Sequence, residues 1–217
     1  MTERLKRIFN EIPKCKSFAD VGCDHGFIAE EMIKSGKCDS VIISDISAPS
    51  LKKAEKLLKK YIDCGLVPAV CTDGLNGIDP LTEVVLIAGM GGEEIIKIIK
   101  SSSFLPPVLV LQPMKNVDKV RINIQALGYG IVKDYLFYDK KYYNLLVCRL
   151  NEKVLPYSQK EILFGRDNLL TKSPDFLFWL KKEIALMEKC LSLAKADNER
   201  AEIKEKFDLY NEILNGN

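Results

Sequence analysis

The sequence predicts an α/β fold with a mostly parallel sheet of seven strands, followed by a helical hairpin of coiled-coil type. Three patterns predict this fold. Short apolar runs alternate with amphipathic segments as far as residue 128, two long strand-like segments follow, and only helical periodicity remains after residue 157. The 217 residues suffice for one domain of ordinary size with an appendage. We therefore divide the chain into residues 1–150 and residues 151–217.

Five predicted strand–helix units fill most of the first part, after an initial amphipathic helix over residues 2–11. In the second unit Ser47 caps a helix that has Pro49 in its first turn. Residues 130–139 and 141–150 then form two long strands joined by a tight turn, which places an antiparallel hairpin at the edge of the sheet. The predicted strands are residues 17–22, 41–45, 67–72, 84–88 and 108–111, and the predicted helices are residues 26–35, 47–63, 117–127 and a segment ending near residue 100.

Helical patterns alone mark the second part of the chain. A capping box at Ser158 and Glu161 opens a short helix to about Leu170, and a long helix starts at Ser173. The repeat of apolar residues is interrupted at residues 197–198, which predicts two antiparallel helices. Steps of three and four separate the apolar residues, as in a coiled coil: Phe176, Leu180, Ile184, Met187, Leu191 and Ala194, then Ile203, Phe207, Tyr210 and Leu214.

Composition argues against several classes of protein. The seven cysteines form no Cys-x-x-Cys pair and there is a single histidine, so we expect no metal site and free thiols in a reducing compartment. No apolar run reaches the length of a membrane span, and residues 1–10 lack the apolar core of a signal peptide. We therefore expect a cytoplasmic protein without membrane attachment.

The charge distribution is uneven but mild. Residues 151–217 contain 11 Lys and Arg against 12 Asp and Glu, whereas residues 1–150 contain 21 against 18. This is not the balance of a protein that coats nucleic acid. Basic residues cluster between Arg4 and Lys16 and between Lys115 and Arg121; we interpret each cluster as a solvated helix face, with a local basic binding patch as the alternative.

The segment from Phe18 to Phe27 reads as a strand, a glycine turn and the start of a helix. A dinucleotide-binding turn would need glycine where Asp24 and Phe27 stand, so that bare backbone can face a pyrophosphate. The carboxylate of Asp24 would repel a diphosphate, and Asp20 adds a second carboxylate beside Gly22. A cationic ligand without phosphate, such as S-adenosylmethionine, suits this turn. The alternative is a connecting turn that merely holds Gly and Asp.

The ends of the next strands carry similar side chains. Asp45 ends the second strand, where a carboxylate can accept both ribose hydroxyls, and Asp73 follows the third, where it can accept an adenine amine. An Asp after a strand is often a helix cap or turn former, yet parallel strands bring these ends to one edge. The expected cofactor-binding residues are Asp20, Gly22, Asp24, His25, Gly26, Asp45, Ile46, Asp73, Gly74, Leu75, Ala88 and Gly89.

Three motifs resemble a known family. The segments Ala19–Gly26 (ADVGCDHG), Ile87–Gly92 (IAGMGG) and Leu111–Pro113 (LQP) are similar to those of the bacterial methyltransferases that modify N1 of adenine 22 in tRNA. These are class I S-adenosylmethionine-dependent methyltransferases with a Rossmann-like fold. The resemblance covers most of residues 1–150 and, more loosely, the helical tail. Met114 departs from the family pattern, where an Asn is expected, as does Asn144, where an acidic residue is commoner.

The resemblance implies S-adenosylmethionine as the cofactor, tRNA as the substrate and residues 1–150 as the catalytic domain. N1 of neutral adenine has a free lone pair, so the reaction needs alignment rather than a strong general base. The adenine must be flipped out to expose that edge. The residues expected around the reacting base are Gly89, Met90, Gly91, Gln112 and Pro113.

Several alternatives stay open on the sequence. Met90 could pack in the core rather than against a base, and His25 could cap the following helix rather than contact a ligand. The hairpin could hold tRNA, dimerise or cover the sheet, and the sequence specifies no protein partner. The whole chain could methylate a small molecule or a protein, or could bind an adenosine ligand without catalysis.

Overall fold

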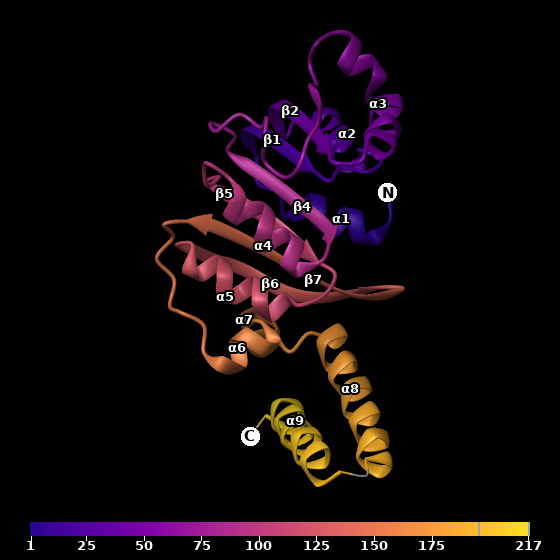
Figure 1. Cartoon of the computed structure of the whole chain (residues 1–217), viewed down its shortest axis with the longest axis vertical. Helices are drawn as coiled ribbons and strands as arrows, with labels where there is room; N and C mark the ends of the chain where they lie inside the picture. Colours follow the sequence, from indigo (N-terminus) through magenta and orange to yellow (C-terminus); the bar gives the residue numbers. More distant parts are fainter. Residues whose placement is uncertain (195, 217) are drawn as a thin grey trace.

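The computed structural model describes residues 1–194 and 196–216, and a single seven-stranded sheet forms its centre (Figure 1). The predicted mostly parallel sheet is confirmed, with strand order β3-β2-β1-β4-β5-β7-β6. The strands are β1 (Cys15–Val21), β2 (Cys38–Asp45), β3 (Ala69–Cys71), β4 (Val84–Met90), β5 (Val108–Pro113), β6 (Tyr129–Asp139) and β7 (Lys141–Leu150).

The antiparallel strand is β7, and it lies one position inside the edge. It pairs antiparallel with both β5 and β6, so β6 forms the edge and runs in the same direction as β1 to β5. The apolar run Leu145–Cys148 of β7 is buried along its whole length, as is usual for a strand with a neighbour on each side. The predicted antiparallel hairpin at the edge of the sheet is therefore confirmed, with the reversed strand β7 in the inner of its two positions. As a result, the carboxyl end of β6 shares the edge where β4 and β5 end.

Helices cover both faces of the sheet. Helices α1 (Glu3–Glu11), α2 (Phe27–Lys34) and α3 (Ala48–Asp63) share one buried core, whereas α4 (Gly92–Ser101) and α5 (Val117–Ala126) pack into a second one. The strands supply both cores in alternation, since Leu86 belongs to the first and its neighbours Val85 and Ile87 to the second.

One of the five expected strand–helix units lacks its helix. Residues 72–83, all of which are described, form turns between β3 and β4. Leu75 and Ile78 of this loop are buried against the core that contains α4.

The segment after β7 holds two short helices, α6 (Gln159–Phe164) and α7 (Arg166–Thr171), where one helix was predicted. The predicted capping box is present, with Ser158 accepting from the Glu161 backbone. The break falls at Gly165, whose φ of +85° suits glycine, and a Cβ there would lie 2.8 Å from Nη2 of Arg121. The buried arginine under the backbone thus leaves no room for a side chain at the position where the two helices meet.

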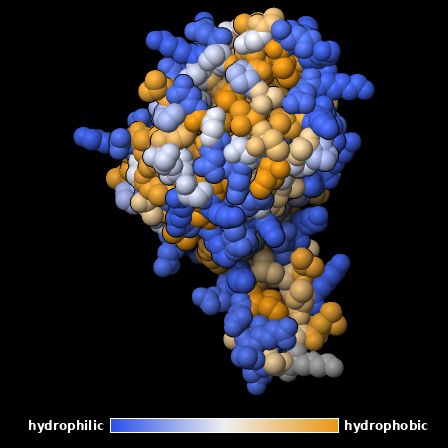
Figure 2. Space-filling view, turned by 45° about the horizontal axis from the view of Figure 1, so that its top comes forward, coloured by the Kyte–Doolittle hydropathy of each residue, from blue (hydrophilic) through white to orange (hydrophobic). Residues whose placement is uncertain are grey.

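The predicted hairpin is confirmed as α8 (Pro174–Leu193) and α9 (Asp197–Asn215), which run antiparallel (Figure 1). The break comes slightly before residues 197–198, because α8 ends at Leu193 and Asp197 already belongs to α9. Figure 2 shows the C-terminal helices as a narrow projection from the body of the molecule. Four buried side chains hold its base together: Phe164, Phe176, Leu180 and Ile213.

Side chains from the C-terminal segment cover the outer edge of β6. Backbone N–H groups at positions 134, 136 and 138 donate to the side chains of Asp167, Asn168 and Asp175 at 2.8, 2.9 and 3.0 Å. These three bonds fix α7 and the start of α8 to the sheet. Within the described residues, no helix is long and apolar enough to cross a membrane.

Candidate functional site

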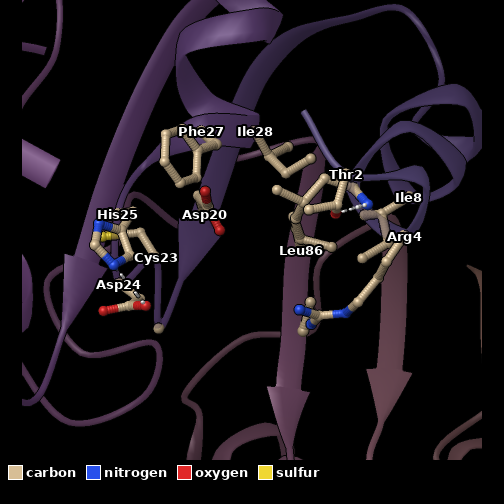
Figure 3. A pocket seen from close by; sticks show the side chains of 13 residues that line it. Thr2, Arg4, Ile8, Asp20, Cys23, Asp24, His25, Phe27, Ile28 and Leu86 are labelled. Atoms are coloured by element: carbon tan, nitrogen blue, oxygen red, sulfur yellow. Dashed lines mark hydrogen bonds and ion pairs between the residues drawn. The ribbon is translucent and has the colours of Figure 1, made fainter. Parts of the chain in front are cut away.

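A pocket of about 240 Å³ opens where the carboxyl ends of β1 and β4 meet α1 and the start of α2 (Figure 3). The geometry is that of an open α/β sheet, whose ligands bind beyond the carboxyl ends of its strands. Five of the residues predicted from sequence line this pocket: Asp20, Gly22, Asp24, His25 and Ala88.

Asp20 provides a carboxylate inside the pocket. The residue is 5% exposed, and the free backbone N–H of Ala29 in the first turn of α2 donates to it. Burial raises the pKa of Asp20 to about 7, because the ionised form loses its hydration. A buried carboxylate of this kind favours a cationic ligand, whose charge would replace the lost water.

Gly22 brings the end of β1 against the end of β4. Its φ is +72°, and a Cβ added there would lie 1.9 Å from Cε of Met90. Only glycine leaves room for this contact. Met90 is half-buried and packs against the core that contains Val21. The methionine therefore lies across the glycine turn, so it is neither a fully buried core residue nor free in solvent.

Asp45 is held in a fixed orientation at the end of β2. Its Oδ1 accepts from the backbone N–H of Ser47 at 2.8 Å, and its Oδ2 accepts from the backbone N–H of Asp24 at 3.3 Å. Each carboxylate oxygen has a further lone pair. The two oxygens can therefore still accept from a pair of adjacent hydroxyls.

The carboxylate of Asp24 is engaged by neighbouring side chains of the protein. Its carboxylate pairs with Nζ of Lys53 at 3.0 Å and lies 3.5 Å from Nε2 of His25. Asp24 thus supports the site through its backbone N–H, and its charge is already paired with Lys53. Gly26, with a φ of +70°, is the N-cap of α2 and makes no side-chain cap bond.

His25 does not cap α2 either. Its ring stacks on that of Phe27, with ring centroids 5.4 Å apart, at the exposed mouth of the pocket. The helix-cap interpretation of His25 is therefore wrong, and contact with a ligand stays a prediction.

The remaining cofactor-side residues lie beside the pocket, at the ends of β2 and β3. Asp73 is exposed two residues after β3, and Ile46 is 68% exposed next to Asp45. Leu75 is buried, and a Cβ on Gly74 would lie 3.2 Å from Ile98, so these two residues shape the loop. The strand order makes the ends of β1, β2 and β3 neighbours, as a site extended along this edge requires.

The acceptor-side residues lie where β4 meets β5. Ala88 pairs with Gln112 and Met90 with Pro113, while Gly89 forms an irregularity between them with a φ of +82°. Gln112 is fully buried; its amide donates to the Pro113 carbonyl at 3.1 Å, and its Oε1 accepts from Nε of Arg4 at 2.7 Å. Gln112 therefore anchors Arg4. Gly91 is the N-cap of α4.

Arg4 is the charged residue among the pocket residues that the sequence did not identify, because it was grouped with the basic N-terminal cluster. Its backbone N–H donates to Asp139 at 2.8 Å, and its guanidinium lies 5.3 Å from the ring centroid of Tyr143. Burial lowers its pKa. Figure 3 shows Arg4 reaching from α1 into the pocket. Its spacing could have indicated its place, because Arg4 precedes the buried Ile8 by four residues and therefore lies on the same inward face of the helix.

Residues 1–146 match the family model described as a methyltransferase domain. The chain belongs to this methyltransferase family. The matched region contains every residue predicted above to bind the cofactor or to surround the reacting group. The pocket of this methyltransferase lies within the matched region, at the sheet edge where open α/β folds bind their ligands.

Similar proteins cover much of this methyltransferase. A Mycoplasma pneumoniae protein with a provisional tRNA methyltransferase name is 30% identical over 150 residues, which span 68% of this chain and 70% of that protein. The Bacillus subtilis tRNA (adenine(22)-N(1))-methyltransferase is 21% identical, over 99% of this chain and 97% of that protein. The Streptococcus pneumoniae protein Sp1610, provisionally described as a tRNA (m1A22) methyltransferase and solved with S-adenosyl-L-methionine, matches with a TM-score of 0.88 and 25% identity, over 99% of each chain.

Proposed function

We propose that this methyltransferase transfers the methyl group of S-adenosylmethionine to N1 of adenine 22 in tRNA. The observation that carries the proposal is the close approach of Met90 to Gly22. It joins the turn expected to hold the acceptor base, residues 89–92 (the acceptor turn), to the turn expected to hold the methyl donor, residues 22–26 (the donor turn). A methyl donor held beside Gly22 would face a base held beside Gly89. The similar proteins from Bacillus subtilis and Streptococcus pneumoniae carry the names that supply the substrate.

The residues of the pocket fit the donor. Bound S-adenosylmethionine supplies an electrophilic methyl group on a sulfonium. The buried carboxylate of Asp20 would accept from the ammonium of its methionine part, and the oriented carboxylate of Asp45 would accept from the ribose hydroxyls. Asp73 would accept from the adenine amine. The carboxylates of Asp20, Asp45 and Asp73 would favour a cationic ligand over a diphosphate, and the one guanidinium that shares the described pocket, that of Arg4, is held on the Gln112 side.

The acceptor side aligns the nucleophile. Neutral adenine attacks through the N1 lone pair, so no residue needs to remove a proton first. The Gly89 backbone allows a flat base to approach closely, Met90 fills the space between base and turn, and Arg4 is oriented by Gln112. Alignment and exclusion of water are then the main sources of rate enhancement.

We assign catalysis to residues 1–150 and tRNA holding to the segment 151–217, in which α8 and α9 form the projecting hairpin. We place the enzyme in the cytoplasm, where its tRNA substrate is found, and assign it no metal. The hairpin could instead dimerise, and that alternative is separable by measuring the mass of the protein in solution with and without tRNA.

The direct test is incubation of the protein with total tRNA and methyl-labelled S-adenosylmethionine, followed by nucleoside mass spectrometry. We expect labelled 1-methyladenosine, and none when adenine 22 of a transcribed tRNA is replaced by guanine. Label in another nucleoside would reject the position, and label in protein or a small molecule would support those substrates instead. Cofactor binding by calorimetry without any transfer would support a noncatalytic scaffold.

A further inference from the structure

A second concave surface lies outside the cofactor pocket. The tip of the β6–β7 hairpin and the first turns of α8 enclose a groove of about 850 Å³. We define this aromatic groove by Tyr138, Tyr142, Phe178, Lys181 and Lys182. None of these residues takes part in the site described above, and none was singled out from the sequence.

We propose that the aromatic groove binds an unpaired nucleotide of the RNA substrate, with its base on the aromatic rings and the neighbouring phosphates on the two lysines. The proposal rests on the proposed function, because it adds a second contact for the same RNA. It differs from the acceptor turn in that the nucleotide bound here is held and not methylated.

The rings of the groove are exposed more than large aromatic side chains usually are. Phe178 is 67% exposed and Tyr138 is 50% exposed. The rings of Tyr138 and Tyr142 lie 5.1 Å apart at an angle of 59°, so they present two differently inclined faces. Exposed aromatic rings stack on bases of any sequence, because every base has a π-face.

The charges of the groove favour an anionic partner. Lys181 and Lys182 are adjacent on α8, and Nζ of Lys182 lies 5.9 Å from the ring centroid of Tyr142. Among the described residues, Asp175 provides the one carboxylate that lines the groove, and it accepts from the Tyr138 backbone N–H at 3.0 Å. An apolar peptide would bury both lysines without a partner, whereas a nucleotide supplies a ring and a phosphate together.

The groove is connected to the acceptor turn through Arg4. Tyr138 precedes Asp139, which accepts from the Arg4 backbone, and Tyr142 precedes Tyr143, whose ring lies beside the Arg4 guanidinium. The carboxyl end of β6 also shares the edge at which β4 ends, and Figure 1 shows the hairpin tip above α8 on that side. One RNA can therefore contact both places.

The experiment compares variants of one exposed aromatic residue. Phe178→Ala removes a ring, Phe178→Trp keeps one, and Leu186→Ala is the control, because Leu186 is 55% exposed on the same helix outside the groove. We expect Phe178→Ala to raise the KM for tRNA by about 5- to 150-fold, from the typical loss of one base stack. Phe178→Trp and Leu186→Ala should retain the wild-type KM, and the cofactor affinity should stay unchanged in all three.

Two further measurements make the outcome decisive. Binding of fluorescent tRNA at several salt concentrations should show a shallower salt dependence for the double variant Lys181→Gln and Lys182→Gln. A wild-type enzyme that methylates tRNA, with a Phe178→Ala variant of equal KM, overturns the groove and leaves the function intact. A wild-type protein that makes no 1-methyladenosine rejects the function, and the tRNA-binding series then decides the groove alone. Equal losses for Leu186→Ala would assign the effect to α8 generally and also overturn the proposal.

Discussion

The guanidinium of Arg121 donates two hydrogen bonds to the carboxylate of Asp134, at 2.7 and 2.8 Å, and both side chains are completely buried. The remaining Nη1 of Arg121 donates to the carbonyls of Ile162 and Leu163 at 3.0 and 3.1 Å. A single buried ion pair thus connects α5, the edge strand β6 and the end of α6.

We expect Asp134→Ala to lower the free energy of unfolding by about 3–5 kcal/mol, because the arginine would stay buried without its counter-charge. Urea denaturation followed by circular dichroism measures this loss. The control is Lys204→Ala, which breaks an exposed pair with Asp208 and should change stability by less than about 1 kcal/mol. A loss below about 1 kcal/mol for Asp134→Ala would contradict the role given to the ion pair.

Asp45→Ala should weaken binding of S-adenosylmethionine by about 1.5–3 kcal/mol, which is roughly 10- to 150-fold, because charged acceptors for the ribose are lost. Isothermal calorimetry measures the change. Asp39→Ala provides a matched control, since Asp39 is exposed near the other end of the same strand. Equal affinities of wild type and Asp45→Ala would remove the ribose assignment.

The raised pKa of Asp20 predicts a particular pH dependence of stability. Its folded-state pKa of about 7 exceeds the usual value of 3.8. Between these values the unfolded chain has lost the proton that the folded protein keeps, so the stability contributed by the protonated group falls as pH rises. Asp20→Asn removes this dependence. Relative to wild type, we expect the variant to gain on the order of 4 kcal/mol in free energy of unfolding between pH 4 and pH 7.

The same group should make cofactor binding depend on pH in the opposite direction. An ammonium ligand needs the ionised carboxylate, and the ammonium itself stays protonated below about pH 7.7. The affinity of the wild type for S-adenosylmethionine should therefore rise as pH increases from 5.5 to 7. In Asp20→Asn the affinity should be low and nearly constant. A flat profile in the wild type would show that Asp20 does not face the ammonium.

Met90 is expected to act mainly on turnover. Met90→Ala would open space beside Gly22, and a misalignment of about 1 Å can cost on the order of 100-fold in rate. Because Met90 is only half-buried, its loss should cost less stability than the 2–5 kcal/mol typical of a core methionine. Met90→Leu should keep most of the activity. Single-turnover methylation and thermal melting measure the two effects.

Met32→Ala is the matched comparison for Met90→Ala. Met32 is fully buried in α2, so its truncation should show the full loss of stability, while the single-turnover rate of the folded fraction is retained. A Met90→Ala enzyme with wild-type turnover, or one as unstable as Met32→Ala, would speak against a place beside the reacting base.

Local patterns predicted most of the elements and the sheet edge at which the pocket opens. The Ser47 cap, the Ser158 capping box and the glycine turn at Gly22 are short-range signals, and each is found where expected. Parallel strand topology then brings the ends of β1, β2 and β4 together. The residues at the ends of these strands could therefore be predicted to lie close together before any long-range contact was known.

The features that escaped prediction depend on contacts between distant residues. Arg4 and Gln112 are 108 positions apart, and nothing local to either one indicates their hydrogen bond. The room for glycine alone at position 165 depends on a buried arginine 44 positions earlier in the chain, and the interior place of β7 depends on its pairing with the distant β5. Periodicity within one element does not contain such information.

The three side chains that accept from β6 have a consequence for the solution behaviour of the chain. Asp167, Asn168 and Asp175 occupy the row of donors where another strand would otherwise bind. A molecule ending at Leu150 would expose that row, and its open edge would invite strand exchange and aggregation between copies. Residues 151–175 thus protect the edge strand from pairing with another copy of the chain. A truncated protein used to measure RNA binding must therefore keep the first turns of α8, because Asp175 lies there.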